Sequence, residues 1–497
     1  MGKSSEINMI SLSDITQEML TPAMKHFYEV KNEHPDCLLL YRMGDFYETF
    51  FDDAVTMSRE LELTLTGREC GELGRIPLAG IPAKALDSYL ERLVKKDIKI
   101  AVCEQLEDPK FAKGIVKRGV VRVITAGTLY ESNLLNNNSN NYMCAIFKQK
   151  DKWGFAYTDI STGEFKATEL DYDTLLTELV RIQPSEVVAV VKKMKLQPFQ
   201  IVPEEMVDLP DEIVQNYNCS KVPANVFEEH FAINNLKQVF KLKSLDSIGY
   251  AACPLGMRAA AGLLAYIWEN MKGGFPKFET IKTYELSEYV SIDAGTRKNL
   301  ELTETLREKS KYGSLLWSID KTSTNMGARL LKSWICQPLK DKDKICERQE
   351  VVKKIINNSD ARFQLVELLK KIYDIQRLST KLSNTTASPR DYLSLKMSLN
   401  FLPKLVETAS SIGLSVFNPI IDYVSSLQDY ADIIERTLAD DAPMQIKEGG
   451  LIKDGVSSDL DYLRDLMFNG ENWLKEFEQK ERERTNIPTL KVGYNRV

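Results

Sequence analysis

An aromatic ring and a carboxylate lie two residues apart in the stretch Tyr41–Phe50, which reads YRMGDFYETF. Phe46 offers a flat apolar surface, and Glu48 offers a hydrogen-bond acceptor. Apolar side chains that are pushed between base steps from the minor groove unstack and kink a duplex. This pair therefore suggests a probe that enters a base stack and hydrogen-bonds a base.

The same stretch also has a structural interpretation, which is the more common one for such residues. Asp45 and Glu48 have the spacing of a capping box, so a helix is expected to begin at Asp45. The apolar residues that follow recur at helical intervals as far as Leu61 and give this helix one buried face. Phe46 is then an aromatic residue at the edge of the core, and Glu48 is a helix cap.

Basic residues gather in the segment Lys84–Arg122, which holds ten basic and six acidic residues. The whole chain has a net charge of −6, so any contact with nucleic acid has to be local. A solvated protein face is an equally good interpretation of such charges. The candidate contacts to a DNA backbone are Arg42, Lys84, Lys113, Lys117, Arg118, Lys475, Lys480, Arg482 and Arg484.

Composition indicates a multidomain protein with reduced cysteines. The 497 residues allow about three or four domains, and 43% of them are hydrophobic. No apolar run reaches the ~18 to 20 residues that span a bilayer, so no membrane partner is expected. Eight cysteines without a CxxC pair and three histidines support neither a zinc site nor a disulfide framework. A cytoplasmic location fits this cysteine usage best.

The elements that position the probe are predicted to alternate between helices and strands. Thr21–His34 has the apolar spacing of an amphipathic helix, and the apolar run Cys37–Leu40 is typical of a buried strand. After the probe we expect a half-buried strand at Leu61–Thr66 and a turn-rich connection at Pro77–Pro82. A helix at Ala85–Lys96 and strands at Ile98–Cys103 and Val120–Thr125 complete this α/β domain.

Composition shifts divide the chain into six segments. Residues 131–142 are rich in asparagine, which predicts a linker. The next segment is expected to open with three antiparallel strands, and the pattern becomes almost wholly helical from Phe275 onward. The predicted boundaries are a polar lead-in at 1–20, an α/β domain at 21–130, the linker at 131–142, a second α/β domain at 143–274, a helical domain at 275–445 and a further segment at 446–497.

The later segments carry a series of expected helices. Ser458–Thr485 is predicted to be long and highly charged, and Thr489–Val497 is predicted to be a strand. The other predicted helices are Thr296–Glu308, Met326–Ile335, Asp343–Asn357, Ala361–Tyr373 and Leu393–Glu407.

Several motifs occur in an order that is known from one family. They are Gly44–Glu48 with Phe51–Ala54, Pro77–Pro82, Ala101–Gln105 with Glu107–Pro109, Val120–Thr125, Tyr157–Phe165 and Asp320–Leu331. Together they resemble the MutS family of bacterial DNA mismatch repair proteins, from about Thr21 to the last residue. No single short motif carries this resemblance.

The resemblance implies a multidomain fold. Residues 21–130 resemble an α/β mismatch-recognition domain, and residues 143–274 resemble an α/β connector domain of the ribonuclease-H-like type. Residues 275–445 resemble a mainly α-helical core and lever bundle. Residues 446–497 resemble the first part of a helical clamp, so the chain is expected to be the N-terminal part of a longer protein.

The resemblance also implies a function and partners. Phe46 would wedge into the duplex at a mispaired base, and Glu48 would hydrogen-bond that base. The DNA partner would be a double strand with mismatches or small loops. The full-length family protein is an ATP-dependent homodimer that acts as a DNA damage sensor and sliding clamp, and it recruits MutL and the sliding clamp of replication. It is cytoplasmic and associated with the nucleoid.

No cofactor is expected in this chain. A search for the phosphate-binding pattern GxxxxGK[ST] finds no match in the 497 residues. The resemblance therefore implies that ATP and Mg²⁺ belong to the C-terminal ATPase domain of the family, and that this chain alone has no ATPase activity.

Two other functions stay open at this point. The chain is alternatively a truncated or diverged interaction remnant that no longer senses mismatches. A nuclease is a weaker alternative, because Asp159 and Glu164 are carboxylates near a strand turn, but two-metal nucleases need further acids that the sequence does not place.

Overall fold

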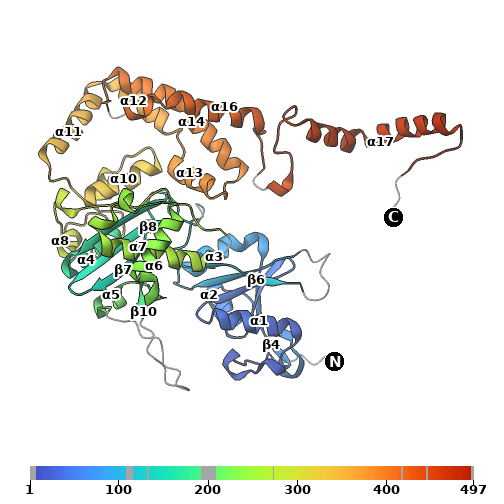
Figure 1. Cartoon of the computed structure of the whole chain (residues 1–497), viewed down its shortest axis with the longest axis horizontal. Helices are drawn as coiled ribbons and strands as arrows, with labels where there is room; N and C mark the ends of the chain where they lie inside the picture. The colour runs from blue at the N-terminus through green and yellow to red at the C-terminus, as the bar shows by residue number, and fades with distance from the viewer. Residues whose placement is uncertain are drawn as a thin grey trace. The chain divides into compact units, whose positions relative to one another are not determined.

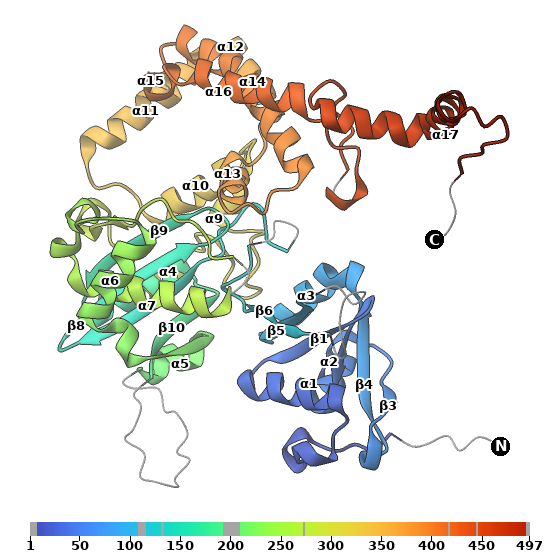
Figure 2. The same ribbon diagram turned by 45° about the vertical axis from the view of Figure 1, so that its right-hand side comes forward.

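A computed structural model of the chain describes residues 7–107, 116–130, 134–191, 209–271, 274–415, 418–443 and 446–493. The chain divides into two compact units (Figures 1 and 2). The first unit comprises Met1–Val352 with Ser379–Thr385, and the second comprises Lys353–Leu378 with Thr386–Val497. Each unit is described by itself below.

The first unit begins with a six-stranded sheet in the order β3-β4-β2-β1-β5-β6. Only β1 and β5 pair in parallel; the other neighbours are antiparallel. The strands are β1 (Leu38–Met43), β2 (Phe46–Phe50), β3 (Thr66–Glu69), β4 (Arg75–Pro82), β5 (Ile100–Gln105) and β6 (Arg118–Ile124).

Helices cover both faces of this sheet. Helix α1 (Pro22–Glu33) packs its buried Phe27 against the face that carries Leu39 and Tyr41. Helices α2 (Phe51–Leu61) and α3 (Leu86–Val94) pack against the opposite face, which carries Leu38 and Leu40. The expected helix at Thr21–His34 and the expected helix at Ala85–Lys96 are therefore confirmed, with slightly shorter bounds.

The probe stretch forms a β-hairpin, so the predicted helix start at Asp45 is wrong. Gly44 and Asp45 make the turn between β1 and β2, and Met43 pairs with Phe46. Gly44 has a φ of 59°, which glycine adopts without steric cost. Strand β2 is paired on both edges, by β1 and by β4. These two ladders outweigh the local capping signal, and the helix begins only at Phe51.

Two further predictions in this domain are wrong. Pro77–Pro82 is no turn-rich connection, because it belongs to strand β4. Proline cannot donate to a strand ladder, which made a turn the natural prediction. The expected strand at Leu61–Thr66 is replaced by the end of α2, a left-handed Glu62 and strand β3 beginning at Thr66.

A second six-stranded sheet follows, in the order β11-β10-β7-β8-β9-β12. Strands β7, β8 and β9 form an antiparallel meander, which confirms the three expected strands. Helix α7 (Pro254–Asn270) covers one face, and α4 (Tyr172–Ile182) covers the other. The strands are β7 (Met143–Gln149), β8 (Lys152–Asp159), β9 (Glu164–Leu170), β10 (Glu186–Val191), β11 (Cys219–Pro223) and β12 (Lys282–Thr283).

Shorter helices complete the first unit. The predicted helix Thr296–Glu308 is wrong beyond Asn299, because Glu301 takes a left-handed conformation and its side chain accepts a hydrogen bond from the backbone of Leu306. The helices are α5 (Asp211–Asn216), α6 (Glu229–Val239), α8 (Ala294–Asn299), α9 (Leu315–Ile319), α10 (Asn325–Cys336) and most of α11 (Lys342–Asn357).

The described part of the second unit is helical. Helix α14 (Pro389–Ser411) packs against α12 (Ser359–Leu369) and α16 (Val424–Thr437). The short α15 (Asn418–Ile421) also belongs to this unit, whereas α13 (Ile375–Ser383) is shared between the two units at Leu378 and Ser379. These helices confirm a mixed α/β part followed by a helical part.

Helix α17 has the predicted bounds, Ser458–Thr485. Residues 489–493 form no strand, so the predicted terminal strand is wrong there, and residues 494–497 lie outside the described residues.

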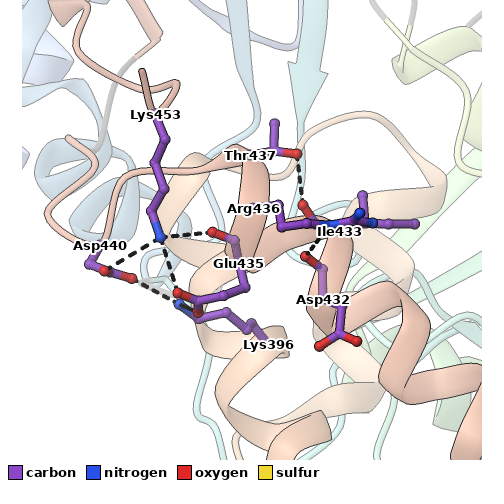
Figure 3. Close-up of polar contacts among 8 residues, drawn as sticks. All are labelled: Lys396, Asp432, Ile433, Glu435, Arg436, Thr437, Asp440 and Lys453. Carbon is purple, nitrogen blue, oxygen red and sulfur yellow. Dashed lines mark hydrogen bonds and ion pairs between the residues drawn. The ribbon is translucent and has the colours of Figure 1, made fainter. Parts of the chain in front are cut away.

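A cluster of four charges fixes the segment that leads to α17 (Figure 3). Lys396 of α14 donates to Glu435 of α16 at 2.7 Å and to Asp440 at 3.0 Å. Lys453 also donates to Glu435, at 3.0 Å. An antiparallel bridge between Leu438 and Ile452 lies beside these contacts. We call these four charged residues the root cluster, because they join two packed helices to the chain that enters α17.

Candidate nucleic-acid interface

Phe46 and Glu48 occupy the start of β2 and point to the same face of the sheet, since alternate residues of a strand share a face. Phe46 keeps 48% of its surface exposed. Tyr47, between them, points to the other face and is buried in the core with α2 and α3. An exposed phenylalanine at a hairpin is thus held by a strand whose other side chains are packed.

Arg68 fixes the Glu48 carboxylate. Its Nη1 donates to Glu48 Oε2 at 2.9 Å, and the two side chains are 37% and 22% exposed. The guanidinium also lies over the ring of Phe50, 5.7 Å from its centroid. Sequence reasoning missed Arg68, because β3 was predicted several residues too early and no local pattern links the two residues.

Arg42 and Arg118 brace the hairpin. Arg42 donates to the carbonyl oxygen of Gly44 at 2.6 Å and lies over the ring of Tyr47. Arg118 donates to the carbonyl oxygen of Arg42 at 2.9 Å and lies over the ring of Tyr41. Both are half-buried, and their hydrogen bonds to backbone carbonyl oxygens hold the turn in place.

Lys84 and Lys117 are exposed near the same hairpin. Lys84 follows Pro82, which pairs with Phe46, and the backbone N–H of Ala83 donates to the carbonyl oxygen of Asp45 at 2.8 Å. Lys117 directly precedes Arg118 at the start of β6. The structure therefore brings Arg42, Lys84, Lys117 and Arg118 to the neighbourhood of the hairpin, whereas Lys113 lies outside the described residues.

The four candidates in the second unit lie on α17, and they differ in whether their charges already have partners within the protein. Arg482 donates to Glu478 and to the carbonyl oxygen of Leu490, and Arg484 pairs with Glu481 at 2.8 Å. Lys475 and Lys480 are exposed, and neither forms an ion pair with a described residue. Of these candidates, the two lysines are the ones whose charge is available to a partner.

Asp159 and Glu164 have structural contacts. Asp159 is fully buried and accepts hydrogen bonds from Asn140, from the backbone of Asn141 and from Ser161. Glu164 pairs with Lys166 at 2.7 Å. Within the described ranges, no three His, Cys, Asp or Glu residues are grouped so that they could hold a metal ion. No observation favours the nuclease alternative.

The described helices include none with the length and apolar character that a membrane crossing requires.

Three family models match the chain in sequence order. They are described as MutS domain I, MutS domain II and MutS domain III, and they match residues 21–133, 141–279 and 295–489. The chain belongs to the MutS family, and the mixed α/β domains and the helical part described above correspond to these three domains.

Two similar curated proteins are both named DNA mismatch repair protein MutS. The one from Alkaliphilus oremlandii is 40% identical over 482 residues, covering 96% of this chain and 54% of the relative. The one from Acaryochloris marina is 41% identical over 486 residues, covering 97% of this chain and 55% of the relative. The chain thus spans about half the length of the curated relatives that it matches.

Proposed function

We propose that this chain binds double-stranded DNA and recognises mismatched base pairs or small loops in DNA mismatch repair. The observation that carries the proposal is the exposed Phe46 on a braced hairpin, with the Glu48 carboxylate fixed on the same strand face. The names of the curated relatives support the same assignment. Residues 21–130 are the proposed mismatch-recognition domain.

Discrimination in this proposal comes from the energy that is needed to deform the duplex. The Phe46 ring enters the stack from the minor groove, and unstacking costs about a few kcal/mol per base step. A mispaired base is unstacked more cheaply than a Watson–Crick pair, so the same wedge binds a mismatch more tightly. Glu48 accepts a hydrogen bond from the displaced base.

Arg68 has a defined part in this mechanism. A carboxylate beside a polyanion is repelled, and a bound guanidinium offsets that repulsion. We infer that Arg68 allows Glu48 to approach the duplex while keeping its oxygens directed along the hairpin.

The remaining assignments are proposals drawn from the family. Residues 143–274 serve as the connector, 275–445 as the core and lever, and 446–497 as the first part of the clamp. Lys475 and Lys480 are the proposed backbone contacts of the clamp. ATP hydrolysis, dimerisation and recruitment of MutL are assigned to no residue of this chain.

The test compares binding to a duplex with one G·T mismatch and to its matched control at one fixed, moderate salt concentration, because phosphate contacts change affinity steeply with salt. We expect the wild-type chain to prefer the mismatch by about tenfold, and Phe46→Ala to lose that preference. Phe363→Ala is the control, since Phe363 is 68% exposed on α12 of the second unit.

A mismatch preference that survives in Phe46→Ala contradicts the assignment of the wedge. Equal binding of both duplexes by the wild-type chain would mean either that sensing needs the part of the relatives that this chain does not cover or that the chain is an interaction remnant.

A further inference from the structure

Glu186, the first residue of β10, is a charged residue with no exposed surface. Its carboxylate accepts four hydrogen bonds. They come from Thr125 Oγ1 at 2.5 Å, from the backbone N–H of Gly127 at 3.1 Å, from Tyr266 Oη at 2.5 Å and from the hydroxyl group of Ser220. All four donors are neutral groups.

A buried carboxylate is costly unless its oxygens are hydrogen-bonded, and these four donors supply those bonds. Burial, and then the Glu186 carboxylate, raise the pKa of Tyr266 well above its usual value, which keeps the phenol a donor. An apolar side chain at this position would need no hydrogen-bond donors. The four-fold hydrogen-bonded carboxylate therefore points to a role in connecting its donors.

The donors come from the two α/β domains of the first unit. Ser220 and Tyr266 belong to β11 and α7, which are part of the same domain as Glu186. Thr125 and Gly127 belong to the loop that leaves β6, the last strand of the first sheet. The Glu186 carboxylate thus holds the loop that follows β6 against the second α/β domain.

The loop that contains Gly127 fits closely against that domain. A Cβ atom at Gly127 would lie 2.8 Å from Met143 Cβ and 2.9 Å from Glu186 Oε2, so only glycine allows this approach. Asn141 adds two contacts, because it donates to the carbonyl oxygen of Ala126 at 2.9 Å and accepts from Ser185 at 2.5 Å. The connection is a packed contact and not a free tether.

The same loop is joined to the probe hairpin through strand ladders. Strand β6 pairs with β5, β5 pairs with β1, and β1 pairs with β2, which carries Phe46. A shift of the hairpin against DNA would move this sheet and therefore the loop at its end.

We propose that Glu186 is a positioning residue that locks the Thr125–Gly127 loop onto the second domain, so that a movement of the Phe46 sheet reaches α7. The lock itself is independent of DNA, whereas the transmission rests on the proposed function. Proximity alone does not establish coupling, so the two parts are tested separately.

The first experiment uses a matched pair of variants of the full chain without DNA. Thr125→Val and Ser220→Ala each remove one hydroxyl donor from the same carboxylate, one on the loop side and one on the domain side. Thr125 Oγ1 also contacts Thr128, so Thr128→Val, which leaves the bonds to Glu186 in place, gives the part of the exchange that is due to hydrogen bonds within the loop. Hydrogen exchange at residues 125–130 is measured by mass spectrometry, with thermal unfolding as the stability control. We expect exchange about tenfold faster in Thr125→Val and within about twofold of wild type in Ser220→Ala. Equal exchange in the two variants, or no change in Thr125→Val, overturns the lock.

The second experiment repeats the exchange measurement with G·T-mismatched and matched duplexes. In the wild-type chain the mismatch is expected to alter exchange at both the hairpin and α7 (Pro254–Asn270). In Thr125→Val the hairpin response should remain and the α7 response should disappear. Transmission to α7 is contradicted if the α7 response persists in Thr125→Val. It is also contradicted if wild type shows a hairpin response without an α7 response. A hairpin without any mismatch response contradicts the proposed function instead, and the DNA-free experiment still decides the lock.

Discussion

At the scale of single residues, the candidate site contains Phe46 and Glu48, which the sequence identifies, and Arg68, which only the structure places beside Glu48. The residue types and spacing of Phe46 and Glu48 are sufficient to suggest a wedge and an acceptor. Arg68 lies 20 positions from Glu48 and reaches it because β3 and β2 both pair with β4. Such a partner depends on strand register, which local pattern does not determine.

The ion pair between Arg68 and Glu48 gives a prediction about selectivity. Glu48→Gln should strengthen binding to the matched duplex by about fivefold. The substitution removes the repulsion between the Glu48 carboxylate and the DNA phosphates, which we expect to amount to about 1 kcal/mol. Arg68→Met should weaken binding to both duplexes by a similar factor, because Glu48 then keeps its charge without a partner. Fluorescence anisotropy titrations at fixed salt measure both effects.

The double variant is the control for this pair. If the two residues act together, Arg68→Met should have little effect in the Glu48→Gln background. Additive effects of the two substitutions would show that Arg68 acts independently of Glu48.

At the scale of secondary structure, the probe is presented by a hairpin where local signals favour a helix. Asp45 and Glu48 have capping-box spacing, yet the aromatic-rich β2 pairs on both edges and buries Tyr47 and Phe50. Burial against two neighbouring strands is a tertiary effect, so a single sequence window underestimates it. Helices with strong periodicity, such as α17, have the bounds that the sequence predicts.

The hairpin turn depends on the backbone of Gly44. A Cβ atom there would meet no neighbour within 4 Å, so Gly44→Ala tests only the left-handed conformation. We expect it to destabilise the first unit by about 1 kcal/mol and to weaken mismatch recognition. Gly470→Ala in α17 is the contrasting control, which also meets no neighbour and should stabilise its helix by about 0.5–1 kcal/mol. Urea unfolding measures the stability of the two variants. Equal changes of the same sign in the free energy of unfolding would refute this explanation.

The root cluster predicts how the chain that enters α17 is held. Lys396→Met should speed hydrogen exchange in residues 437–453 by about tenfold, because Glu435 and Asp440 lose their shared donor. Lys404→Met is the matched control, since Lys404 lies on the same helix and, among the described residues, pairs with Glu407 at the helix surface. Unchanged exchange in Lys396→Met would mean that the backbone bridge and the contacts of Lys453 fix this segment without Lys396.

The pH dependence of the root cluster follows from the directions of its pKa shifts. Hydrogen bonds from Lys396 are the main cause that lowers the pKa of Glu435 and of Asp440. The hydrogen bond to Glu435 is the main cause that raises the pKa of Lys396. The cluster therefore contributes fully at neutral pH, and its contribution is lost as the pH falls through the lowered pKa values of the two carboxylates.

At the scale of the whole molecule, the order of the domains is accessible from sequence because many motifs occur in a fixed order over nearly the whole chain. The contact between the two α/β domains was not accessible. Residues 131–142 have the composition of a linker, yet Leu134 is buried and Asn141 holds the loop after β6. Composition describes what a segment cannot build alone, but it does not show what the segment packs against.

Charge distribution predicts how the whole molecule responds to salt. With a net charge of −6, DNA binding should depend on a few local cations such as Lys84 and Lys117. Replacing both with Gln should reduce the slope of log affinity against log salt by about 1.8, since each phosphate contact contributes about 0.9. The ratio of mismatch to matched affinity should stay the same. A changed ratio would assign these lysines to recognition rather than to backbone contact.

The position of β2 inside its sheet also has a kinetic consequence. A strand that is paired on both edges is held in one conformation, so the proposed wedge would need little rearrangement to bind DNA. Encounter with matched and with mismatched DNA should then proceed at similar rates. The difference between the two duplexes would lie in how long each complex lasts, because a matched duplex expels the ring as its bases stack again.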